Sequence, residues 1–116
     1  MASSSSAAAI VNPLIGNVIT EKLNKTNYAL WKAQVLAVVR GARLEDHLTG
    51  ASKPPSATTK EKQGEKEVDV PNPLYGNWIA VDQQVLAFLL SSVTKDILSQ
   101  VAGSTTAALL RHKGHF

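Results

Sequence analysis

Few side chains in this sequence are suited to acid–base or metal chemistry. Histidines stand at positions 47, 112 and 115, and the spacing of His112 and His115 is one that some metal sites use. The sequence contains no cysteine, and no carboxylate lies near this histidine pair, so we expect no metal site. Glu45 and Asp46 are adjacent and would point about 100° apart on a helix, so they do not converge as a general acid and base.

Known catalytic motifs are also missing from the sequence. There is no glycine-rich phosphate loop, dinucleotide-binding fingerprint, nucleophile elbow or zinc-binding helix motif. A catalytic pocket would have to bring His47, Tyr75 and Asp82 together from separate elements, and nothing in their spacing predicts this. We therefore expect no enzymatic activity, no cofactor and no small-molecule substrate.

Two aromatic pairs suggest a different chemistry, the stacking of nucleic-acid bases. Tyr28 and Trp31 lie beside Lys32, and Tyr75 and Trp78 follow later in the chain, a mixture of aromatic and basic groups that some nucleic-acid binders use. Both tryptophans, however, recur with apolar residues at helical spacing, where packing in a core is the ordinary role. We therefore expect both tryptophans to pack in the core.

The charge of the chain is mildly basic. The 116 residues carry a formal net charge of +3 and have a sequence pI of about 9.3. This balance permits weak attraction to RNA without identifying a nucleic-acid binder. The candidate contact to a polyanion is the run Arg111, His112 and Lys113.

The N-terminus and the apolar segments favour a soluble protein. The first residues lack the basic region and apolar core of a secretory signal, and no apolar run reaches the length of a membrane span. We expect an intracellular, cytoplasmic protein that makes no membrane contact.

The strongest helical pattern follows Lys22 and ends at Gly41. Tyr28, Trp31 and Val35 recur at spacings of three and four, which places them on one face, and Thr26 or Asn27 is suited to cap the first turn. An extended arm before it should pack Val18, Ile19 and Leu23 against this helix, and a shorter helix should follow at 44–48.

A second amphipathic helix is predicted after Asn72 and Pro73, which suit the cap and the first helical position. Trp78, Val85 and Leu89 step along one face, with Asp82 to Gln84 as a polar interruption. Short helices are expected at 95–101, capped by Thr94, and from Ser104 or Thr105 to about Leu110.

These patterns predict an all-α fold, a small bundle of four to five short helices. Its parts are a flexible tail at 1–13, helical parts at 14–50 and 72–110, a polar charged linker loop at 51–71 and a divergent basic tail at 111–116. The loop is predicted because 51–71 contains balanced charges and hardly any large apolar residue. The candidate core or interface residues are Leu23, Tyr28, Trp31, Val35, Leu36, Tyr75, Trp78, Val85, Leu86 and Leu89.

Several motifs in order resemble a known family. They read V-I-x-x-K-L-N-x-x-N-Y-x-x-W-x-x-Q-V-L-x-x-x-R-G from Val18 to Gly41, N-P-x-Y-x-x-W from Asn72, D-Q-x-V-L-x-x-L-L-S-S from Asp82 and A-G-x-T-T-A-A from Ala102. This combination is similar to the N-terminal part of the Gag polyproteins of plant copia-type retrotransposons. The resemblance implies a capsid-type, all-helical domain that assembles into virus-like particles around RNA.

The resemblance also implies which partners to expect. They are a second copy of the chain or full-length Gag, with RNA binding left mainly to a cysteine-containing zinc knuckle that this chain lacks. After Ala108 the sequence departs from the family pattern, which favours a truncated copy. Two functions follow: a non-catalytic Gag-like assembly module, or a nucleic-acid-binding accessory fragment that acts through Arg111, His112 and Lys113.

Overall fold

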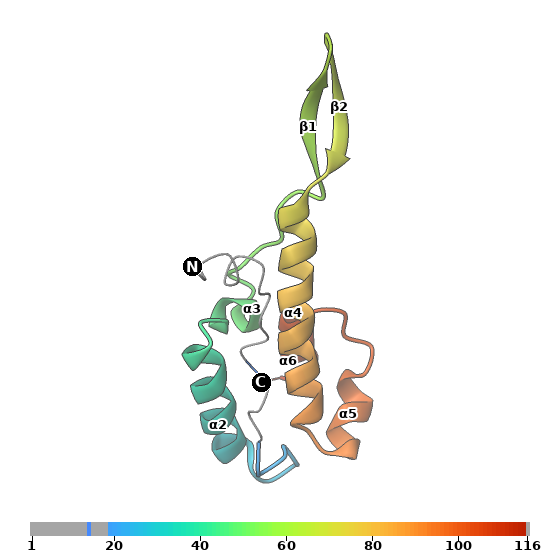
Figure 1. Ribbon diagram of the computed structural model, residues 1–116. Coiled ribbons are helices and arrows are strands. Elements are labelled where there is room, and N and C mark those ends of the chain that lie inside the picture. The colour runs from blue at the N-terminus through green and yellow to red at the C-terminus, as the bar shows by residue number, and fades with distance from the viewer. Residues whose placement is uncertain (1–13, 15–18, 116) are drawn as a thin grey trace.

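The computed structural model describes Leu14 and residues 19–115 of the chain. Within these residues it has five helices and one β-hairpin (Figure 1). The elements are α2 (Tyr28–Gly41), α3 (Glu45–Thr49), β1 (Thr58–Gln63), β2 (Lys66–Pro71), α4 (Pro73–Ser91), α5 (Lys95–Val101) and α6 (Ala107–Lys113). The expected flexible tail at 1–13 and Val18 of the expected arm lie outside the described residues.

The helix ends show which polar residues set the boundaries. Asn72 accepts a hydrogen bond from the Leu74 amide at 3.1 Å, and Pro73 is the first residue of α4, as predicted. Asn27 precedes α2 but makes no capping bond. Its side chain instead accepts from the Asn24 amide and donates to the Lys22 carbonyl, both at 2.8 Å, so it fixes the turn before the helix.

The last helix begins at Ala107, two or three residues later than the predicted start at Ser104 or Thr105. Thr106 caps α6 by accepting a hydrogen bond from the Leu109 amide at 3.1 Å, and Gly114 follows the end of the helix. Thr94 precedes α5 but makes no capping bond. Its hydroxyl donates instead to the Leu23 carbonyl at 2.8 Å, which ties the N-terminal arm to the start of α5.

One apolar core joins the arm to all the helices. Leu23 forms a parallel bridge with Val93, through bonds from the Leu23 amide to the Ser92 carbonyl and from the Thr94 amide to the Leu23 carbonyl, each 2.9 Å. Burial of apolar area is the main stabilising contribution in such a small unit. The buried core residues are Leu14, Ile19, Leu23, Trp31, Val35, Val39, Leu48, Val85, Leu86, Phe88, Leu89, Val93, Ile97, Val101, Ala107 and Leu110.

The prediction of an all-α fold is wrong, because residues 58–71 of the expected linker loop form an antiparallel hairpin. β1 pairs with β2 along six residue pairs, from Thr58 opposite Pro71 to Gln63 opposite Lys66. Gly64 opens the two-residue turn with φ of +69°, a conformation that glycine adopts without a steric penalty. The chain is therefore a mixed helical and β structure, and low apolar content did not make this segment a loop.

The hairpin gives the molecule an elongated shape. In Figure 1 it projects beyond the N-terminal end of α4, away from the other helices. The radius of gyration is 17.4 Å, compared with about 13 Å for a compact domain of roughly 100 residues. Among the described residues, no helix is long and apolar enough to cross a membrane.

Candidate functional site

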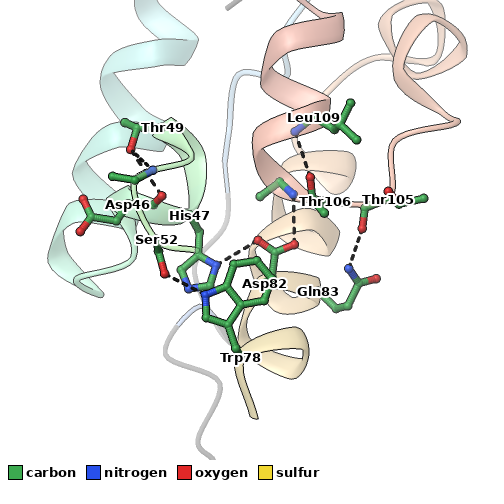
Figure 2. Close-up of polar contacts among 12 residues, drawn as sticks. Asp46, His47, Thr49, Ser52, Trp78, Asp82, Gln83, Thr105, Thr106 and Leu109 are labelled. Atoms are coloured by element: carbon green, nitrogen blue, oxygen red, sulfur yellow. Dashed lines mark hydrogen bonds and ion pairs between the residues drawn. The ribbon is translucent and has the colours of Figure 1, made fainter. Parts of the chain in front are cut away.

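A buried cluster of polar groups, centred on Asp82, is the densest concentration of reactive side chains in the described structure. The Asp82 Oδ1 atom lies 2.9 Å from His47 Nδ1, and its Oδ2 accepts a hydrogen bond from the Ala107 amide at 3.2 Å (Figure 2). His47 is 7% exposed and Asp82 1%. Each carboxylate oxygen therefore has a hydrogen-bonding partner, and α3, α4 and the start of α6 are joined at one point.

Trp78 covers one side of this cluster. Its ring stacks on the His47 ring with 4.9 Å between centroids and 29° between planes, and its indole N–H donates to Ser52 Oγ at 2.8 Å. Figure 2 shows the His47 ring overlapping the Trp78 ring, with a dashed line from His47 to Asp82. Trp78 is half-buried. It covers the His47 ring on one side and, through Ser52, holds the segment after α3.

The cluster contains two of the three residues that a catalytic pocket was expected to need. The sequence named His47, Tyr75 and Asp82 as the residues that a catalytic pocket would need, and the structure brings only His47 and Asp82 together. Tyr75 is exposed and lies two turns away, roughly 10 Å along α4. Within the described residues, the side-chain hydrogen bonds of the pair are the one between His47 and Asp82 and the one from the Ala107 amide. The pair connects α3, α4 and the start of α6 through these bonds.

The described residues also contain no group of three or more histidine, cysteine, aspartate or glutamate side chains that could hold a metal ion. His112 is exposed in the last turn of α6, and His115 follows that helix with φ of +59°. The two histidines therefore lie at the end of a short helix, without a third ligand from another described element.

A second buried contact involves Trp31 of α2. Its indole N–H donates to the Ser92 carbonyl at 2.9 Å and approaches Ser92 Oγ at 3.1 Å. The same carbonyl accepts the Leu23 amide. Trp31 therefore links the arm, α2 and the end of α4 as well as filling the core, and the sequence pattern indicated only the packing.

The ten candidate core or interface residues divide by burial. Six are buried, two are half-buried and two are exposed. The buried ones are Leu23, Trp31, Val35, Val85, Leu86 and Leu89; Leu36 and Trp78 are half-buried, and Tyr28 and Tyr75 are exposed. The two tyrosines are consequently the members of this set that are placed to meet a partner.

A small apolar hollow lies beside α2. It is lined by Tyr28, Trp31, Lys32, Val35, Leu36, Leu48, Leu89 and Arg111, and its volume is about 40 Å³. Binding sites for small molecules usually enclose roughly 300–1,000 Å³. The hollow is therefore too small for a typical metabolite.

The basic residues of α6 do not form one surface. Arg111, His112 and Lys113 are all exposed, but consecutive helical residues point about 100° apart. Arg111 lines the hollow beside α2, and the Lys113 ammonium lies 3.0 Å from where a Cβ on Gly103 would stand. The two outer cations thus face different elements, and contact with a polyanion through this run stays a prediction.

Comparison with known proteins reveals similarity to plant retrotransposon polyproteins. The chain is 33% identical over 99 residues to the retrovirus-related Pol polyprotein from transposon RE2 of Arabidopsis thaliana, and 32% identical over 99 residues to that from transposon RE1. Each match covers 85% of this chain and 6% of the relative. No protein-family model and no solved structure matches the chain.

These matches bear on origin more than on activity. The chain spans a small part of each relative's length, so a polyprotein's overall activity does not transfer to it. The similarity extends along most of the chain, and it supports a retrotransposon origin for this protein.

Proposed function

We propose that the chain is a non-catalytic, Gag-like structural module of a copia-type retrotransposon, which associates with itself or with full-length Gag. The similarity to retrotransposon polyproteins over 85% of the chain carries this proposal. Its Gag and copia-type parts rest on the order of motifs between Val18 and Ala108.

Exposed apolar side chains support a role in assembly. Leu74 and Tyr75 are neighbours at the start of α4 and are 65% and 36% exposed, and Leu30 on α2 is 52% exposed. A small unit with a limited core gains stability when such groups are buried between copies. The start of α4 therefore offers a contact surface next to the base of the hairpin.

The polar chemistry of the described residues supports the non-catalytic part of the proposal. The carboxylate of Asp82 is shared between His47 and the Ala107 amide, and the cluster is closed to solvent. Each carboxylate oxygen thus already takes part in a contact that holds the helices together.

The experiment is size-exclusion chromatography with light scattering, over a wide range of concentration, on the chain alone and mixed with a full-length copia-type Gag. We expect larger species that depend on concentration, or mixed species with Gag. A folded monomer under every condition, which also stays separate from Gag, would show that the proposal is wrong.

A matched pair of variants tests the surface at the start of α4. Leu74→Glu should reduce the mass of the associated species at an unchanged melting temperature, because Leu74 is mostly exposed. Ala87→Glu adds the same charge at an exposed position of α4, roughly 20 Å further along the helix, and should leave association unchanged. Equal effects from both variants would indicate general charge repulsion instead of a specific surface.

A further inference from the structure

The hairpin formed by Thr58–Pro71 has two long edges that are unpaired within the described residues. Every residue of β1 is exposed, and in β2 only Val68 and Val70 are half-buried. An isolated two-stranded hairpin is marginally stable in water, and free strand edges are templates for pairing with another chain. Its projection away from the helices (Figure 1) leaves both edges accessible.

One face of the hairpin is basic along β1 and acidic along β2. Lys60 stands opposite Asp69, and Lys62 stands opposite Glu67. Residues directly opposite in an antiparallel pair share a face, so all four side chains lie together. The Lys60 Nζ atom is 2.8 Å from Asp69 Oδ1.

The backbone of these same four residues faces outward. A two-residue turn at Gly64 and Glu65 makes Gln63 and Lys66 the pair that closes the ladder. Hydrogen-bonded and non-hydrogen-bonded pairs then alternate along an antiparallel ladder. The backbone N–H and C=O groups of residues 60 and 62 on β1, and of residues 67 and 69 on β2, therefore point away from the hairpin.

This charge pattern disfavours pairing of two β1 edges or of two β2 edges. Two β1 edges related by a two-fold axis would place the outward residues Lys60 and Lys62 against lysines of the other copy. Two β2 edges would likewise place Glu67 and Asp69 against carboxylates. Like charges directly opposite one another are destabilising, so a symmetric dimer through either edge is disfavoured.

Unlike edges are complementary. When β1 of one copy lies antiparallel to β2 of another, Lys60 faces Asp69 of the second copy and Lys62 faces Glu67 of the second copy. This is the register that the hairpin already uses internally. In it, the outward N–H and C=O groups of β1 in one copy can form hydrogen bonds with those of β2 in the other copy.

We infer that the hairpin is a contact between copies of this chain, in which the β1 edge of one copy pairs with the β2 edge of the next. The contact is head to tail, so each copy keeps a free edge for another neighbour, and such contacts build rings or open arrays. The inference rests on the proposed self-association and specifies one interface for it.

A charge-inverted variant tests this contact. It combines Lys60→Glu, Lys62→Glu, Glu67→Lys and Asp69→Lys, which keeps the net charge of the chain and the opposite charges within the hairpin. The variant should associate with itself as the wild type does. Mixed pairs between β1 and β2 would oppose like charges, so association of variant with wild type through this contact should be weaker by about tenfold or more. Mixed pairs between like edges would gain opposite charges, so self-association of Lys62→Pro is measured alongside.

Energy transfer between labelled copies measures the mixing. The chain has no cysteine, so Ala102→Cys, at an exposed site directly after α5, gives one labelling position. Arg40→Glu combined with Glu45→Arg is the matched control, because it inverts an exposed ion pair of 2.9 Å on the helices at constant net charge. Copies of this control should mix freely with the wild type.

The outcomes separate this inference from the proposed function. If the inverted copies mix with the wild type as well as the control does, and Lys62→Pro also leaves self-association unchanged, the hairpin contact is wrong and self-association stands. If no species associates at any concentration, both proposals are wrong. Should the inverted variant fail to fold, Lys62→Pro replaces it, because proline removes an outward N–H without breaking the internal ladder; unchanged association would then overturn the inference.

Discussion

The helical body and the β-hairpin each contain a carboxylate paired with a basic side chain, and the two pairs have almost the same length. His47 Nδ1 lies 2.9 Å from Asp82 Oδ1, and Lys60 Nζ lies 2.8 Å from Asp69 Oδ1. Their surroundings differ sharply, with side-chain exposures of 8% and 2% in the body and 64% and 59% in the hairpin. Distance alone therefore does not rank the two contacts.

Solvent decides what each pair contributes. When an exposed pair is broken, water binds both groups, and such pairs contribute roughly 0–1 kcal/mol. When a buried partner is removed, the remaining donor or acceptor has no water to replace it, at a cost of about 1–3 kcal/mol for each group. The body is thus sensitive to single changes at buried positions, whereas the hairpin tolerates changes that keep its ladder.

The largest loss of stability is expected from Trp31→Ala. The change removes a buried ring from the core and the indole donor to the Ser92 carbonyl, and it should lower the free energy of unfolding by about 3–5 kcal/mol. Chemical denaturation followed by circular dichroism measures this. Loss of folding altogether agrees with the prediction, because small domains have a total stability of only about 5–15 kcal/mol.

Trp31→Phe is the control for that change. It keeps an aromatic ring in the core but loses the indole N–H, so it should cost clearly less than Trp31→Ala. If the two variants are equally destabilised, the hydrogen bond to Ser92 outweighs the packing. If alanine costs less than about 1 kcal/mol, Trp31 does not anchor the core as described.

The next largest loss of stability is expected at Asp82, and it should be larger than the loss at Asp69. Asp82→Ala leaves His47 and the Ala107 amide without their acceptor and should cost about 2–4 kcal/mol. Asp69→Ala removes the same side chain from the exposed pair and should cost at most about 1 kcal/mol. Thermal and urea unfolding of both variants provide the measurement, and equal losses would contradict the distinction drawn from burial.

The helices of the body could be predicted from sequence because their signals are local. Apolar spacing placed Trp31, Val35, Val85 and Leu89 on buried faces, and Asn72 capped α4 as expected. Hydrophobic periodicity reports a face that must be buried.

The polar contacts and the hairpin could not be predicted in this way. Asp82 looked like a polar interruption of a helix, yet its partners come from residues 47 and 107, which only the tertiary fold brings near. The strands bury no residue completely, so alternation of apolar and polar residues is weak there. The sequence of the hairpin does contain a glycine in a turn between two segments of complementary charge. This pattern indicates paired strands only once the register between them is known.

The smallest effect on stability is expected when the hairpin is removed. A four-residue glycine–serine linker in place of Thr58–Pro71 should change the free energy of unfolding by less than about 1 kcal/mol, because the hairpin contributes no fully buried residue and loop length has a weak effect on closure entropy. Asn72 is kept, so α4 retains its cap. Urea unfolding and helical circular dichroism of the shortened chain test this.

The same shortened chain also tests what the hairpin is for. Selection for the stability of the body would not maintain two exposed six-residue strands with opposite charges along their edges, since the buried core contains no residue of the hairpin. If the shortened chain is destabilised by more than about 2 kcal/mol, the hairpin supports the body and the two regions are not independent. If its stability is unchanged and its self-association is weakened, the body supplies the fold and the hairpin supplies a contact between copies.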